Sequence, residues 1–302
     1  MRAFFASEYV RAAQGGNLSA SAASLTHHRQ PTSKQMIWIN GERQQQIAVS
    51  DRALHYGDGC FTTARLQQGK IAWLEAHLQR LQEAASVLMM QGIDWQRLKQ
   101  EMLHAAASAQ QEDGVLKVIL SRGSGGRGYS AAGCHRPVRI IMLFAAPAHY
   151  AALRESGVRL AISPVRLGIN PQLAGIKHLN RLEQVLIRTQ LEQSGADEAL
   201  VLDTEGKLVE CCAANLFWRK ENQLFTPAIG GAGVDGIMRR RIITLAEQLG
   251  YVCQQVREEP QALAEADEVF ICNALMPLLP VRQIEQWHYR SRTLYQRLLP
   301  DC

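Results

Sequence analysis

The sequence predicts an α/β protein of the α+β kind, folded as two lobes. Short extended runs separated by glycine-containing turns alternate with stretches in which apolar residues recur every three or four positions. The chain has 302 residues, 47% of them hydrophobic, which is enough to bury a substantial core. A linker expected at residues 146–157 separates two groups of elements, so we place the lobes at residues 36–150 and 151–302.

The first 35 residues differ in composition from the rest. They are rich in Ser, Ala and Gln, short of large aliphatic side chains, and without the apolar segment of a signal peptide. We therefore expect residues 1–35 to be a disordered N-terminal extension, with Met36 as the start of the folded part. A transit peptide is the alternative, because the segment is basic and poor in acidic residues.

The first lobe opens with two hairpins. Asn40-Gly41 and Gln68-Gly69 each stand between extended runs, a pattern typical of tight turns. Apolar residues then recur at helical spacing, and two strands follow. The elements predicted here are helices at 74–91 and 94–110 and strands at 114–122 and 138–144.

The second lobe combines short strands with two longer helices. We expect one helix to begin around Lys177 and run to about residue 194, and another at 236–249 after a glycine-rich stretch. The expected strands are 158–167, 198–203, 208–220, 223–227 and a buried strand with a loop at 267–281.

Charge and cysteine content argue against several classes of protein. The net charge of +5 is mild and spread along the chain, which favours small anionic ligands over nucleic acid. Seven cysteines without a CxxC pair, and no HExxH spacing, indicate reduced thiols in the cytoplasm and no metal site. No apolar run is long enough to span a bilayer, so we expect no membrane association.

The stretch "GSGGRG", residues 123–128, formally fits a dinucleotide-binding fingerprint. Such a fingerprint must open a helix, and Pro137 in the following residues prevents a long one. We interpret the segment as a glycine-rich loop between two strands. Its Arg122, Arg127 and Tyr129 are candidates to face an anionic substrate.

Three charged residues stand where an ordinary surface residue is not expected. Glu210 lies in the apolar, strand-like run "LVECCAANLF", where a buried carboxylate needs a cationic or proton-donating partner. Lys177 stands at the expected start of a helix, and Arg80 lies between two core leucines. On local sequence alone each could instead be solvated, as most such side chains are.

Six short motifs together resemble a known family. In chain order they are "GDGCFTTAR", "HLQRLQ", "GIKHLNRLEQ", "ECCAANLFW", "GVDGIMRR" and "CNALMPLLPV". Their order and spacing resemble the fold-type IV pyridoxal-phosphate enzymes, the branched-chain and D-amino acid aminotransferase family. The resemblance runs from Met36 almost to the C-terminus. It implies pyridoxal 5′-phosphate as cofactor and a homodimer in which a loop of the partner subunit completes each site.

The resemblance also implies roles for single residues. Lys177 matches the lysine that carries the cofactor and then serves as base and acid, and Glu210 matches the acid that pairs with the pyridine nitrogen. Arg80 matches the arginine that grips the phosphate. Asn180 is a candidate to orient cofactor or substrate.

Further phosphate contacts are expected at two other segments. Backbone N–H groups of Ile237 and Met238 would bind the phosphate at a helix start, and Asn273 with Ala274 would form a second phosphate-binding loop. The family often has hydroxyl residues at two of these places. Met238 and Ala274 cannot supply a hydroxyl, so their contacts must come from the backbone or from water.

The resemblance implies a lyase reaction within this family. The expected substrate is 4-amino-4-deoxychorismate, which loses pyruvate and leaves 4-aminobenzoate for folate synthesis. The alternative is an aminotransferase for branched-chain or D-amino acids, which would share Lys177, Glu210 and Arg80. The sequence does not identify the residues that bind the two substrate carboxylates.

Overall fold

The computed structural model describes residues 36–109 and 113–302. The chain divides into two units, Met1–Lys34 and Gln35–Cys302, and the second is described here by itself. The expected disordered extension, residues 1–35, lies outside the described residues.

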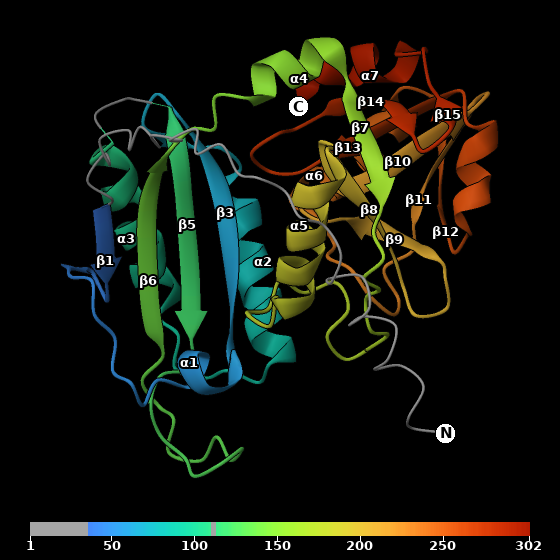
Figure 1. Cartoon of the computed structure of the whole chain (residues 1–302). Coiled ribbons are helices and arrows are strands. Elements are labelled where there is room, and N and C mark those ends of the chain that lie inside the picture. The colour runs from blue at the N-terminus through green and yellow to red at the C-terminus, as the bar shows by residue number, and fades with distance from the viewer. Residues whose placement is uncertain (1–35, 110–112) are drawn as a thin grey trace, which may run out of the picture. The chain divides into compact units, whose positions relative to one another are not determined.

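Within the described residues, six strands of the first half of the chain form one antiparallel sheet (Figure 1). Their order across the sheet is β2-β1-β6-β5-β3-β4. Both predicted hairpins are confirmed, and Asn40, Gly41, Gln68 and Gly69 all have the positive φ that tight turns require. The strands are β1 (Met36–Ile39), β2 (Glu42–Arg43), β3 (Gly59–Gln67), β4 (Lys70–Ile71), β5 (Gly114–Ser121) and β6 (Val138–Ala145).

Two predicted helices, α2 (Leu74–Val87) and α3 (Trp95–Ala107), pack on this sheet. Their leucine, methionine and alanine side chains share one core with inward-facing residues of β3, β5 and β6. α2 ends earlier than the predicted residue 91, because Met89 adopts a positive φ. A short helix, α1 (Arg52–Tyr56), precedes β3 and was not predicted.

A second sheet of nine strands, counted over the same described residues, is built from the second half of the chain. Its order is β12-β11-β10-β13-β14-β7-β8-β9, with β15 paired to β14. The parallel pairs are β7 with β8, β7 with β14 and β11 with β12. The strands are β7 (Val158–Ile162), β8 (Glu198–Leu202), β9 (Leu208–Cys211), β10 (Asn215–Lys220), β11 (Gln223–Pro227), β12 (Val252–Val256), β13 (Glu268–Cys272), β14 (Leu279–Ile284) and β15 (Trp287–His288).

Helices cover this sheet and connect its strands. The helix predicted at 236–249 is confirmed as α6, and the expected linker contains α4. The helices of this half are α4 (Tyr150–Ser156), α5 (Leu182–Ser194), α6 (Ile237–Gln248) and α7 (Thr293–Leu298), with 3-10 turns η2 (Pro260–Glu265) and η3 (Leu299–Asp301).

Two predictions about this half are wrong in detail. The helix expected to begin around Lys177 begins at Leu182, because the preceding segment makes its backbone hydrogen bonds to the first sheet. The strand expected at 208–220 is interrupted at Cys212–Ala214, where the chain turns between β9 and β10. That turn places Glu210 at the end of a strand.

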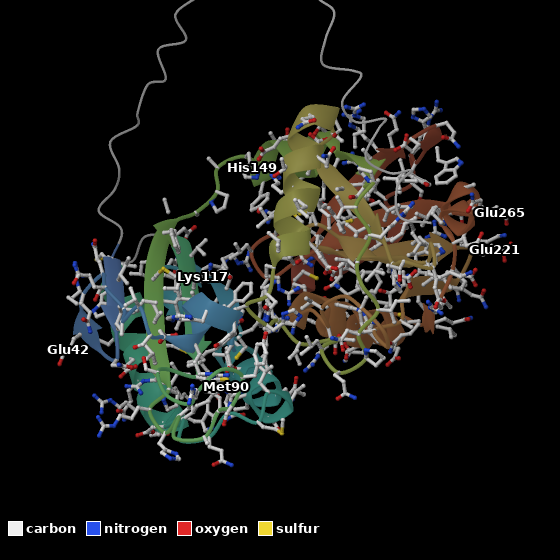
Figure 2. The ribbon with its side chains drawn as sticks, turned by 60° about the horizontal axis from the view of Figure 1, so that its bottom comes forward. Glu42, Met90, Lys117, His149, Glu221 and Glu265 are labelled. Carbon is white, nitrogen blue, oxygen red and sulfur yellow. The ribbon has the colours of Figure 1, made fainter. Side chains whose placement is uncertain are left out.

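The two sheets lie on either side of the expected linker. In Figure 2, Glu42 and Met90 mark the first half, Glu221 and Glu265 the second, and His149 the connection. We keep residues 36–150 and 151–302 as the proposed lobes, which the sheet boundaries at Ala145 and Val158 support. No helix in the described part of the chain is long and apolar enough to cross a membrane.

Candidate active site

Lys177 lies in an extended segment that pairs with the start of β3. Its carbonyl accepts a hydrogen bond from the Phe61 N–H at 2.9 Å, and the Leu179 N–H donates to the Gly59 carbonyl at 3.0 Å. Position 59 must be glycine, because a Cβ there would lie 2.1 Å from the Leu120 carbonyl oxygen. The close approach of these backbones fixes where the lysine side chain begins.

Lys177 is partly exposed as a whole residue, but its amine is buried and lies over an aromatic ring. Its Nζ is 4.8 Å from the centroid of Phe61, and it makes no hydrogen bond or ion pair with any residue in 36–109 or 113–302. Burial, together with the charges of Arg80 and Arg181, lowers the pKa of Lys177 from 10.5 to about 7. A large share of this amine is therefore unprotonated near neutral pH, as a base or nucleophile requires.

Arg181 holds the backbone on both sides of Lys177. Its Nε donates to the His178 carbonyl at 2.8 Å and its Nη2 to the Ile176 carbonyl at 3.0 Å. The guanidinium thus fixes the segment and adds positive charge beside the lysine. Sequence reasoning did not identify this residue, because an arginine next to an expected helix is ordinarily solvated.

Glu210 lies at the end of β9 with a side chain that is 5% exposed. Its Oε2 accepts a hydrogen bond from the Val234 N–H at 2.8 Å, and it forms no ion pair within the described residues. Burial raises its pKa, and the Val234 N–H and the charges of Lys177 and Arg181 oppose that shift. The carboxyl group is therefore well suited to share a proton with a ring nitrogen.

A pocket of about 330 Å³ brings these side chains together. Arg80, 9% exposed, reaches it from α2, and burial lowers the pKa of Arg80 to about 10, so the guanidinium stays charged at neutral pH. The pocket is lined by Phe61, Thr63, Arg80, Tyr150, Lys177, Arg181, Gln184, Glu210, Cys211, Cys212, Ala213, Ala214, Asn215, Val234, Gly236, Ile237, Asn273, Ala274 and Leu275.

One end of the pocket is formed by the start of α6. Gly236 precedes the helix, and a Cβ at that position would lie 2.0 Å from the Asn215 Oδ1. Ile237 lines the pocket, whereas the Met238 side chain is buried in the core behind it, so only its backbone can reach a ligand. The free N–H groups of a first helical turn bind anions well.

The expected second phosphate-binding loop also reaches the pocket. Asn273 and Ala274 line it, and the Asn273 side chain is occupied by the loop itself. Its Nδ2 donates to the Ala213 carbonyl, and its Oδ1 accepts from the Leu275 and Met276 N–H groups. Asn273 thus shapes the loop, and Ala274 offers only backbone and methyl groups.

Four other candidate residues do not line the pocket. Asn180 is exposed and donates to the Gly57 carbonyl at 3.2 Å. Arg122 is bonded to Asp58 and to two backbone carbonyls. Arg127 is exposed, and Tyr129, 88% exposed, contacts Tyr56. The glycine-rich loop that carries Arg127 and Tyr129 is confirmed as a loop between β5 and β6 (Figure 1).

Several pocket residues were not identified from the sequence. Phe61 and Thr63 are two residues apart on β3, so their side chains lie on the same face of the sheet. That alternation in "CFTTAR" is the one signal that could have indicated them. Lys117 on β5 lies over the same Phe61 ring, with its Nζ 5.2 Å from the centroid. No group of three or more His, Cys, Asp or Glu that could hold a metal exists among the described residues.

Taken together, the pocket combines a weakly basic amine, a buried carboxyl group, a charged guanidinium and a helix N-terminus. This set defines a site for a phosphorylated, nitrogen-containing cofactor on a two-sheet α/β scaffold. The chain belongs to the class IV aminotransferase family: residues 59–284 match the family described as "Amino-transferase class IV". Membership of this family indicates pyridoxal 5′-phosphate as the cofactor.

Individual relatives agree with this assignment. The chain is 38% identical over 249 residues to an aminodeoxychorismate lyase of Vibrio harveyi, covering 82% of this chain and 91% of the relative. It is similar to the crystal structure of 4-amino-4-deoxychorismate lyase from Pseudomonas aeruginosa, with a TM-score of 0.83 and 36% identity, over 88% of this chain and 99% of that one. The expected fold-type IV architecture is thereby confirmed.

A third likeness is to an aminotransferase. A relative in Methanocaldococcus jannaschii, named "Putative branched-chain-amino-acid aminotransferase", is 31% identical over 261 residues. The match covers 82% of this chain and 88% of the relative. Its identity to this chain is lower than that of the two lyases.

The lowered pKa of Lys177 predicts how stability depends on pH. Between pH 7 and 10.5 the unfolded chain binds more protons at this lysine than the folded protein does, so the free energy of unfolding should rise with pH in that window. In cofactor-free protein, Lys177→Met removes this contribution. Its stability advantage over wild type should be largest below pH 7 and shrink as the pH approaches 10.5.

Urea unfolding of both proteins at several pH values measures the difference, with Lys70→Met, an exposed lysine, as the control. A stability difference between Lys177→Met and wild type that stays constant from pH 6 to 10 contradicts the assigned pKa.

Proposed function

We propose that this protein is a pyridoxal-phosphate-dependent lyase that converts 4-amino-4-deoxychorismate to 4-aminobenzoate and pyruvate. Its similarity to two lyases of that name, at 38% and 36% identity, supports this substrate over that of the aminotransferase relative at 31%. The observation that carries the cofactor assignment is the Lys177 amine, without a hydrogen-bond partner in the described residues, in one pocket with Glu210 and Arg80.

The residues present fit this cofactor. Lys177 would carry it, and Glu210 would bind its ring nitrogen. Arg80 and the first turn of α6 would bind the phosphate. When bound, pyridoxal phosphate supplies an electron-accepting ring that stabilises negative charge at the carbon next to the amine it holds.

Two side chains of this chain hold or transfer protons in the reaction. Glu210, kept from water and with a raised pKa, holds a proton at the ring nitrogen. Lys177 removes the proton from the substrate carbon that bears the amine, because burial and two neighbouring guanidinium groups keep a large share of its own amine unprotonated near neutral pH. Phe61 beneath the lysine limits where its Nζ can move.

Loss of that proton drives the elimination that follows, because the electron pair left behind becomes the new double bond of the ring. The bond from the ring to the enolpyruvyl oxygen breaks, and the departing enolpyruvate takes up a proton on its methylene carbon to become pyruvate. The remaining ring is aromatic, which makes the step effectively irreversible. No second amino acceptor takes part.

We propose a homodimer as the working state, in the cytoplasm and in folate synthesis. The seven unpaired cysteines support a reducing compartment. Arg127 and Tyr129 do not line the pocket of their own chain, which supports placing their loop at the pocket of a partner subunit. Among the described residues, Arg122 bonds to Asp58 and to backbone carbonyls and Asn180 bonds to the Gly57 carbonyl, and their roles toward substrate and cofactor stay proposals.

Product analysis tests the function. Protein incubated with enzymatically made aminodeoxychorismate should release 4-aminobenzoate and pyruvate in equal amounts without a 2-oxo acid, and Lys177→Ala should release neither. A requirement for a 2-oxo acid, with leucine or D-alanine converted faster, would establish the aminotransferase alternative instead.

Glu210 and Arg80 have different proposed roles, so their substitution should change different quantities: turnover for Glu210 and cofactor affinity for Arg80. Glu210→Gln should retain the cofactor and slow turnover by about a hundredfold, as the loss of a charge-stabilising group does. Arg80→Ala should mainly weaken cofactor binding, by ~1.5–3 kcal/mol. Cofactor titration and rates at saturating cofactor separate the two, with the exposed Arg97→Ala as the control. Unchanged cofactor affinity in Arg80→Ala contradicts its phosphate role.

A further inference from the structure

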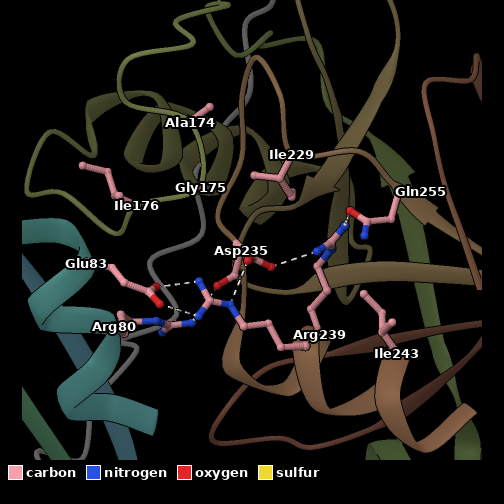
Figure 3. Close-up of a pocket in the computed structure, with 11 residues that line it drawn as sticks. Arg80, Glu83, Ala174, Gly175, Ile176, Ile229, Asp235, Arg239, Ile243 and Gln255 are labelled. Carbon is pink, nitrogen blue, oxygen red and sulfur yellow. Dashed lines mark hydrogen bonds and ion pairs between the residues drawn. The ribbon is translucent and has the colours of Figure 1, made fainter. Parts of the chain in front are cut away.

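Asp235 lies just before α6 and contacts three arginines. Figure 3 labels Asp235 together with two of them, Arg80 and Arg239. Its carboxylate accepts from Arg239 Nη1 at 2.8 Å and from Arg240 Nε at 2.7 Å. Its backbone carbonyl accepts from Arg80 Nη2 at 3.2 Å. One residue therefore connects the guanidinium assigned to the phosphate with the helix start assigned to the same phosphate.

Arg240 extends this connection to the helix that carries Arg80. Its Nη1 and Nη2 donate to the two carboxylate oxygens of Glu83 at 3.1 and 2.7 Å, a bidentate pair. Glu83 lies on α2, one turn after Arg80. Arg240 therefore links α2 to the start of α6.

The charges in this cluster are balanced so that an anion can bind beside it. An isolated Asp235 carboxylate next to a phosphate site would repel the ligand. Arg239 and Arg240 pair with that carboxylate, and Arg240 also pairs with Glu83. Arg80 has only the Asp235 carbonyl as a hydrogen-bond acceptor among the residues described, so other N–H groups of its guanidinium stay available.

Asp235 also forms a hydrogen bond with the segment that carries Lys177. The Asp235 N–H donates to the Gly175 carbonyl at 2.9 Å, and the Gly175 N–H donates to the Gly233 carbonyl at 2.9 Å. Gly175 is two residues before Lys177. Asp235 therefore contacts or adjoins three parts of the pocket: Arg80, the start of α6 and the segment that carries Lys177.

We propose that Asp235, Arg240 and Glu83 are positioning residues that set the geometry of the phosphate end of the pocket through Arg80 and the start of α6. This inference rests on the proposed function, since it takes the phosphate of the cofactor as the ligand. None of the three lines the pocket that holds Lys177. They act through Arg80 and the helix start.

The test compares binding of pyridoxal phosphate with binding of pyridoxal, which lacks the phosphate. Arg240→Gln and Glu83→Gln should each weaken the affinity for pyridoxal phosphate by about three- to tenfold, the effect of losing a partly exposed ion pair that orders a binding group. The affinity for pyridoxal should stay unchanged. At saturating cofactor, kcat should also stay unchanged.

Glu75→Gln is the matched control. Glu75 lies on the same helix α2 and forms an ion pair with Lys99, away from Asp235. This variant should bind both ligands as wild type does. The double variant Glu83→Gln/Arg240→Gln should bind as Arg240→Gln does, because that single variant already removes the pair with Glu83 as well as the pair with Asp235.

Two outcomes overturn the inference. If Arg240→Gln and Glu83→Gln weaken both ligands equally, the cluster only stabilises the fold, and if they weaken neither, it does not position the phosphate site. In both cases wild type still binds pyridoxal phosphate and turns over, so the proposed function stands. A wild-type protein that binds no pyridoxal phosphate overturns the proposed function and this inference with it.

Discussion

The pocket depends on keeping the Lys177 amine away from water and beside two guanidinium groups. Burial and the charges of Arg80 and Arg181 lower the pKa of that amine to about 7. The nearby Glu210 opposes this lowering of the Lys177 pKa. Its own side chain is buried and accepts a hydrogen bond from the Val234 N–H. This arrangement costs stability in the free protein, and a ligand that bonds to both groups would offset the cost.

Much of the fold could be predicted from the sequence because it rests on local signals. The Asn40-Gly41 and Gln68-Gly69 turns, the periodic leucines of α2 and the apolar runs of β5 and β6 each carry their own pattern. The segment from Gly175 to Asn180 could not be predicted, because its polar and apolar residues resemble a helix start. It does not form a helix because Lys177 and Leu179 make backbone hydrogen bonds to β3, a contact between residues more than a hundred positions apart.

The site residues could be predicted where the family resemblance indicated which residues, far apart in the sequence, belong to one site. Lys177, Glu210 and Arg80 are far apart in sequence, and no spacing rule joins them, yet they share one pocket. Asp235 and Arg240 were not identified, because charged residues near a helix start look like an ordinary solvated surface. Only their contacts with Arg80 and Glu83 indicate a connection to the pocket. Arg127 and Tyr129, which looked like substrate residues, lie on an exposed loop.

Lys177 is the residue that we propose carries the cofactor. Lys117 offers a sharp comparison, because its amine lies over the same Phe61 ring. The most direct measurement is borohydride reduction of the protein after incubation with pyridoxal phosphate, followed by proteolysis and mass spectrometry of the labelled peptide. We expect the cofactor mass on the peptide that contains Lys177. Label on Lys117 or on another lysine, with Lys177 unmodified, would contradict it.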